Sequence, residues 1–229
     1  MKIASLIIVL VFATALAAQE TPEAVLVDEH GQLPCDDSLG RIDLWYAELS
    51  NNPGWEGLAV ISTSPELKHK AVFYERLMKA NARFRRADGS LTLKYLRTNS
   101  PGPLKVQLWR IPAGGVRPAI ESEDTTLTLP QGIKPFMLGS EYDGIGGVCP
   151  DEGSDQFVFA EFLKGNPDAR GNIVVRERTL AGSRRRAERL GKSFQKSYGI
   201  PTTRLRFFLR KSSVSANNFE PVVEYWYLP

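Results

Sequence analysis

Apolar residues recur at helical spacing in two stretches of the first half of the chain, and shorter apolar runs separate and follow them. The helical spacing predicts one helix that buries Leu39, Ile42, Tyr46 and Leu49, and a second that buries Leu67, Ala71, Tyr74 and Leu77. The apolar runs predict strands at 58–62, 91–97 and 105–111. The order is therefore helix, strand, helix, strand, strand, with an optional leading strand at 24–27.

Short polar motifs mark where these helices begin. Asp36, Asp37 or Ser38 can cap the first helix, and Ser64-Pro65-Glu66 is a start signal for the second. In the second half of the chain, a helix over 183–198 is expected to bury Ala187, Leu190, Gly191, Phe194 and Tyr198. A leading strand at 135–138 is again optional.

The two halves repeat each other. Seven residues of the first half recur 114 positions later with no gap: Cys35, Asp37, Leu49, Asn52, Pro53, Gly57 and Val60 match Cys149, Asp151, Leu163, Asn166, Pro167, Gly171 and Val174. Glu75-Arg76-Leu77 matches Glu188-Arg189-Leu190, and Leu96-Arg97 matches Leu209-Arg210, both at a spacing of 113. The ends, 106–112 and 223–229, match at a spacing of 117. A repeat of this length indicates tandem copies of one structural unit.

We therefore predict an α+β protein of two tandem two-layer units, each about α-β-α-β-β with an optional leading strand and with helices packed on a small mixed sheet. The first unit covers 19–112 and the second covers 135–229. The intervening segment, 113–134, is rich in Gly, Pro, Ser and Thr, which is typical of a linker. A short strand is expected within it at Thr126 to Leu129.

The first 18 residues read as a secretory signal peptide. Lys2 precedes an apolar run, and Ala15 and Ala17 supply the small residues that signal peptidase requires. The run is shorter than the ~20 residues that a membrane-spanning helix needs. We expect an exported protein, periplasmic or secreted, with no transmembrane segment in its mature form.

Charge is distributed unevenly along the chain. The segment 20–60 holds nine acidic residues and one base, whereas 170–211 holds thirteen bases and two acids. A basic block in an exported protein favours anionic envelope polymers such as peptidoglycan, lipid head groups, envelope proteins or the protein's own acidic end over nucleic acid. The candidate basic face consists of Arg176, Arg178, Arg184, Arg185, Arg189 and Lys192. The alternative is a solvated helix face with no ligand.

The second half resembles the outer-membrane-protein-A-like (OmpA-like) C-terminal domain, an envelope module that binds peptidoglycan. The resemblance covers roughly the last 90 residues and is carried by Leu163 with Asn166-Pro167, by Arg185-Arg186-Ala187 and by 199–205. By the repeat, the first unit is a more distant relative. The resemblance implies peptidoglycan recognition by a paired aspartate and arginine.

Those two ligand-binding positions differ in this chain. Where the family has its aspartate, this chain has Arg176-Glu177-Arg178-Thr179, and the segment 218–222 lacks the family's arginine. Charge-assisted hydrogen bonds to a stem peptide would be lost at both positions.

No pattern of catalytic residues is visible, and we expect neither an enzyme nor a cofactor or metal. His30 is placed in a turn and His69 on the exposed side of a helix, without a hydrolase or metalloprotease motif beside them. The glycines of 144–147 lack the features of a phosphate loop. Asp36, Asp37 and Asp43 do not have the spacing of a calcium loop.

Aromatic residues near the end of each copy, Trp109 and Trp226-Tyr227, can form part of the core or a stacking surface for sugars or proteins, and core packing is favoured.

Cys35 and Cys149 are a candidate disulfide, with buried thiols as the alternative. In the chain-entropy model, closing so long a loop would stabilise the fold by about 4 to 5 kcal/mol.

The sequence thus predicts an exported, non-catalytic interaction protein of the cell envelope. The main alternative is a cell-wall binding module that uses the basic face. An enzyme with dispersed catalytic residues is the third.

Overall fold

The computed structural model describes residues 21–120, 123–141, 154–212 and 222–229. The predicted signal peptide, the glycines of 144–147 and Cys149 lie outside these ranges. The first unit consists of β1 (Val25–His30), α2 (Cys35–Ser50), β2 (Glu56–Thr63), α3 (Lys68–Phe84), β3 (Thr92–Asn99) and β4 (Lys105–Ile111). The second consists of β5 (Phe136–Glu141), α4 (Ser154–Gly165), β6 (Arg170–Glu177), α5 (Leu180–Tyr198), β7 (Leu205–Lys211) and β8 (Val223–Leu228).

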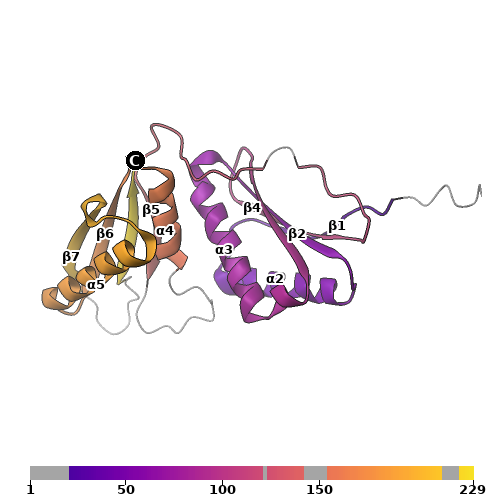
Figure 1. Ribbon diagram of the computed structural model, residues 1–229, viewed down its shortest axis with the longest axis horizontal. Coiled ribbons are helices and arrows are strands. Elements are labelled where there is room, and N and C mark those ends of the chain that lie inside the picture. Colours follow the sequence, from indigo (N-terminus) through magenta and orange to yellow (C-terminus); the bar gives the residue numbers. More distant parts are fainter. Residues whose placement is uncertain (1–20, 121–122, 142–153, 213–221) are drawn as a thin grey trace, which may run out of the picture.

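Each unit contains one four-stranded mixed sheet, and the two sheets have the same topology. The strand orders are β1-β4-β2-β3 and β5-β8-β6-β7. The central strands β2 and β6 run parallel to β3 and β7 and antiparallel to β4 and β8. The helices pack against the sheets, and the two units lie side by side (Figure 1). The predicted fold class is confirmed, including the optional leading strands.

The strand registers show how closely the units correspond. The leading strand of each has a bulge at the equivalent point, between Leu26 and Asp28 and between Met137 and Gly139. The register also corrects one alignment: Gly57 pairs with Leu93, and Gly171 pairs with Leu205, so β3 and β7 correspond at a spacing of 112 rather than 113. The predicted pairing of Leu96-Arg97 with Leu209-Arg210 was therefore shifted by one residue, which exchanges the two faces of the strand.

The packing of the first helix explains why both copies have a glycine at the equivalent positions Gly57 and Gly171. Each glycine lies in the central strand beneath an aromatic ring of the first helix, Trp45 in one unit and Phe159 in the other. A Cβ on Gly57 would lie 2.7 Å from the Trp45 ring, and a Cβ on Gly171 would collide with Phe159. The glycines thus allow a fully buried aromatic side chain to approach the backbone of the strand.

The repeated Asn-Pro motif also has a local role. The Asn52 side chain donates to the carbonyl of Glu48 (2.7 Å), and the Asn166 side chain donates to that of Phe162 (2.8 Å). Both bonds satisfy a carbonyl in the last turn of the first helix, where no backbone N–H is available. Asn166 in addition bonds the linker at Leu127 and Leu129.

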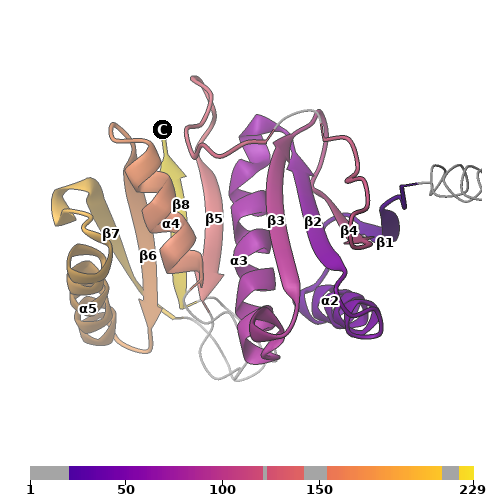
Figure 2. The same ribbon diagram turned by 45° about the vertical axis from the view of Figure 1, so that its right-hand side comes forward.

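Two predictions of local structure were wrong. The first helix begins at Cys35, with Pro34 at its N-cap, so the acidic residues lie in its first turn instead of capping it. The segment 126–129 is not a strand. Its polar groups instead bind Lys68 and Asn166, which fixes the linker to both units. Figure 2 shows the linker passing from the first unit to β5.

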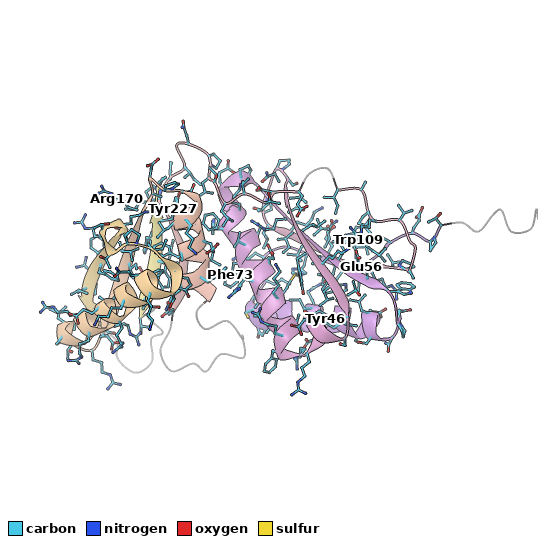
Figure 3. All side chains as sticks on the ribbon, in the orientation of Figure 1. Tyr46, Glu56, Phe73, Trp109, Arg170 and Tyr227 are labelled. Atoms are coloured by element: carbon cyan, nitrogen blue, oxygen red, sulfur yellow. The ribbon has the colours of Figure 1, made fainter. Side chains whose placement is uncertain are left out.

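Helix α3 is buried on two sides. Tyr74, Leu77 and Met78 pack into the core of the first unit, whereas Val72 belongs to the core of the second. Phe73 packs against both cores and lies between the units (Figure 3). His69, Val72, Phe73 and Arg76 follow helical spacing, and we call them the docking face of α3.

The docking face contacts α4 and β5. The His69 ring stacks on Phe136 at 4.3 Å between centroids, and the Arg76 guanidinium lies 4.0 Å from the centre of the Phe157 ring. The two units are therefore held together largely by apolar and aromatic contacts.

A buried ion pair fixes the linker against α3. Lys68 Nζ lies 2.8 Å from Asp124, and both side chains are 7% exposed. Lys68 also donates to Thr126 and to the carbonyl of Thr128. Burial opposes ionisation of Asp124, but hydrogen bonds from Lys68 and Thr126 outweigh it and lower the pKa of this carboxyl.

This pair yields a double-mutant test. Asp124→Leu alone should destabilise the protein by about 3–5 kcal/mol, because it leaves a buried ammonium without its counter-charge. Lys68→Met alone should have a similar cost, while the double variant should be close to the wild type. Urea unfolding measures all four proteins. Additive losses in the double variant would contradict the pairing.

The glycine–aromatic contact yields a second test. Gly171→Ala should destabilise by about 1–3 kcal/mol through overpacking against Phe159, and Phe159→Leu in the same chain should recover part of the loss. Gly40→Ala is the control, because a Cβ there meets no atom within 4 Å. That control should be neutral or stabilise by up to about 1 kcal/mol. Equal effects of the two alanine substitutions would refute the packing role of Gly171.

Candidate functional site

The candidate site is the exposed side of α5, which is sharply amphipathic. The helix starts at a Thr179 side chain that accepts from the Gly182 N–H, and it ends at Gly199 in the left-handed conformation, φ 70°. Its buried side consists of Ser183, Ala187, Leu190, Gly191 and Phe194. Ser183 also donates to the carbonyl of Arg210 (2.6 Å), which attaches the helix to β7.

Four exposed bases form a line along the other side of this helix. Arg185, Arg189, Lys192 and Lys196 follow one another at i, i+4, i+7 and i+11, and we call them the α5 basic stripe. At ~1.5 Å per residue, the stripe is about 16 Å long. None of the four forms an ion pair with another described residue.

In the first unit, by contrast, acids and bases pair extensively. Examples are Arg41 with Asp28, Arg85 with Asp43 and Arg110 with Glu48. The acidic residues of the N-terminal segment are thus largely used within their own unit. The four bases of the α5 basic stripe outnumber the one acid of this helix, Glu188, so the stripe keeps a net positive charge that favours an anionic partner.

The first half of the α5 basic stripe corresponds to part of the docking face of α3. At the repeat spacing of 113, the buried Leu77 and Met78 correspond to the buried Leu190 and Gly191. On the same alignment, Val72 and Arg76 of the docking face correspond to Arg185 and Arg189, whereas Lys192 and Lys196 correspond to the exposed Lys79 and Arg83. The positions that contact the second unit in one copy are therefore exposed bases in the other.

The structure divides the predicted basic face. Four of its residues are exposed on α5, namely Arg184, Arg185, Arg189 and Lys192. Arg178 is exposed in the short connection between β6 and α5. Arg176 does not belong with them, because it alternates with the buried Ile173 and Val175 and so lies on the opposite face of the sheet. There it pairs with Glu224 of β8 at 2.7 Å.

Two other bases of the second unit have structural partners, and one further base belongs to the stripe although it was not among the predicted site residues. Arg186 pairs with Glu177 at 2.8 Å, and Arg204 donates to the carbonyls of Leu163, Asn166 and Ala169 at the end of α4. Lys196 extends the stripe by one turn beyond the predicted set. Its helical spacing from Arg189 and Lys192 was the signal that could have included it.

Both histidines are buried. His30, predicted in a turn, is instead the last residue of β1 and is 7% exposed, with its Nδ1 2.7 Å from the carbonyl oxygen of Gly31. His69 was predicted on the exposed side of its helix, and that prediction was wrong. His69 lies in the interface between the units and is 8% exposed. Burial, with a smaller contribution from the charge of Lys70, lowers the pKa of His69 from 6.5 to about 4.

The aromatic residues near the ends of the copies differ in role. Tyr227 is buried and stacks on Phe136, and Trp109 packs on Leu58 and Val60 beneath the linker. Trp226 is partly exposed, and its indole N–H donates to Glu224. The favoured interpretation as core residues therefore holds for the first two.

Cys35 is disulfide-bonded at the start of α2. Because Cys149 lies outside the described residues, the bond between Cys35 and Cys149 stays a prediction.

Comparisons with protein-family models, with curated proteins and with solved structures found no match. Among the described residues, no helix combines the length and the apolar character needed to span a bilayer.

The buried histidine gives a pH test. Because the folded pKa of His69 lies below its unfolded value, the unfolded chain takes up the proton first, and stability falls as the pH drops from about 6.5 to 4. The loss attributable to His69 should reach about 3 kcal/mol. Urea unfolding at pH 7 and pH 4 should show a smaller difference for His69→Phe than for the wild type. The same pH dependence in both proteins would contradict this assignment.

Proposed function

We propose that this chain is an exported, non-catalytic interaction protein of the cell envelope, which binds an anionic component through the α5 basic stripe. The observation that carries the proposal is the set of four exposed bases that form no ion pair with another described residue, two of which correspond to residues that bind the second unit in α3.

Rigidity supports a binding role for this surface. The α5 helix is fixed at both ends by its caps and along its length by Leu190 and Phe194 in the core. The positions of the bases are therefore largely set before a ligand arrives, which reduces the entropy lost on binding. The guanidinium groups of Arg185 and Arg189 can each bind a carboxylate through two hydrogen bonds.

The use of both histidines in packing supports a role other than catalysis. His69 is enclosed between α3, Phe136 and Phe162, where its function is to join the units.

Peptidoglycan is the specific ligand that we place first, in line with the OmpA-like resemblance. The turn after β6, where that family has its ligand-binding aspartate, is occupied by internal contacts here. Glu177 pairs with Arg186, and Thr179 caps α5. The α5 basic stripe would then replace the family's site with a purely basic one, suited to the carboxylates of the stem peptides.

Co-sedimentation with isolated sacculi tests this function. The mature protein should be retained at moderate salt, and Arg185→Glu with Arg189→Glu should reduce retention at least tenfold, since two attractive contacts become repulsive. The matched control is Arg83→Glu with Lys134→Glu, which changes the net charge equally at two exposed, unpaired bases elsewhere.

The control should bind as the wild type does. Absence of wild-type retention would refute the peptidoglycan proposal, and equal losses in both double variants would show a response to net charge instead of a site.

A further inference from the structure

Each of the two surfaces that meet between the units has an equivalent surface in the other copy, and both of these equivalent surfaces are exposed. Inside the chain, the docking face of α3 binds α4 and β5. The counterpart of α3 is α5, whose basic stripe is exposed. The counterparts of α4 and β5 are α2 and β1.

The outer side of α2 and β1 exposes apolar residues whose counterparts in the second unit are covered. The bulged pairing with the last strand makes Val25 equivalent to Phe136. Phe136 is covered by the His69 ring, whereas Val25 is 40% exposed. Leu44 is 68% exposed, and its counterpart at the repeat spacing of 114 is the fully buried Val158.

A groove marks the same place. It has a volume of about 810 Å³, lies between β1 and α2, and is lined in part by Val27, Leu33, Gly40 and Leu44. The exposed Asp36 and Asp37 lie on its wall and form no ion pair with another described residue. We call this surface, Val25, Leu44, Asp36 and Asp37, the α2 acceptor face.

The two free faces complement each other. Within the part of the chain that the structure describes, the four bases of the α5 basic stripe and the two acids of the α2 acceptor face form no ion pairs, and the acids lie beside exposed apolar side chains. The aliphatic stems of Arg185 and Arg189 can cover Leu44 while their charged ends reach the acids. An exposed apolar group framed by charge is typical of a protein-binding surface.

From this complementarity we infer that the α5 basic stripe of one molecule binds the α2 acceptor face of a second molecule. The partner is thus another copy of this chain, docked in the manner in which α3 docks on α4 and β5. The two surfaces in contact are different, so the association is head to tail and can continue beyond a dimer. The inference rests on the proposed function to the extent that the α5 basic stripe is a binding site, and it names a protein partner for it.

The association should be weaker than the contact inside the chain. The internal contact inserts Val72 and Phe73, whereas the equivalent side of α5 presents Arg185 and Arg186. Polar contacts between exposed charges are screened by salt, so we expect association at low ionic strength and at least a tenfold weakening at 0.5 M salt.

Two one-sided variants provide the decisive experiment. Arg185→Glu with Arg189→Glu disables only the α5 side, and Asp37→Lys with Leu44→Lys disables only the acceptor side. In sedimentation velocity of the mature protein at low salt, the wild type should form dimers and larger species. Each variant alone should be monomeric. Mixed in equal amounts, they should form a dimer that does not grow, because each supplies the one intact face that the other lacks.

A milder acceptor variant, Asp36→Asn with Asp37→Asn, guards against loss of folding, and it should weaken association at least threefold. A wild type that stays monomeric, or variants that fail to complement, would overturn the inference.

Sacculus binding separates this inference from the proposed function. The acceptor variant should keep wild-type retention on sacculi while it loses self-association. A monomeric wild type that binds sacculi would refute the self-association alone, and a self-associating protein that does not bind sacculi would refute the peptidoglycan proposal alone.

Discussion

Helix α3 must bury two opposite sides, and the arrangement of the whole chain depends on this requirement. One side completes the core of the first unit, while the other side places Val72 in the core of the second. The linker follows from it as well, because Asp124 is held at the start of α3 by Lys68. A buried ion pair is expensive to form and costly to break, so it contributes a defined path for the linker more than it contributes net stability. The second unit therefore has one position relative to the first, and α5 remains on the outside.

The repeat in the sequence predicted the fold well because its identical residues perform local structural tasks. Gly57 and Gly171 admit an aromatic ring, and Asn52 and Asn166 bind the last turn of the preceding helix. Such tasks depend on neighbours close in sequence, so spacing alone reveals them. The register of β3 and β7 did not follow, because the loops before these strands differ in length and short matches cannot fix a shift of one residue.

The docking between units was missed for a related reason. His69, Val72 and Phe73 widen the apolar side of α3 beyond what a single core requires, and a buried histidine is easily taken for a solvated one.

The candidate site was predicted only in part. Helical spacing identified Arg184, Arg185, Arg189 and Lys192 correctly as exposed, whereas Arg176 was grouped with them by closeness in sequence. The alternation of β6 places it on the other face, paired with Glu224. Many charges of the acidic N-terminal segment are neutralised within the first unit, and the segment's composition alone did not indicate that Asp36 and Asp37 are the acids left exposed.

The bulge shared by β1 and β5 bears on the history of the chain. An irregularity that interrupts pairing at the same point in two sheets is more simply inherited once than acquired twice. A single ancestral unit then already possessed the bulge, the glycine beneath the aromatic ring and the asparagine at the helix end. The apolar part of the docking face is found in one copy only, because Val72 and Phe73 correspond to Arg185 and Arg186. The bases at Arg76 and Lys79, in contrast, recur as Arg189 and Lys192, so positive charge on this helix side is common to both copies. The change at two positions therefore separates a helix that holds the units together from one whose equivalent side is exposed.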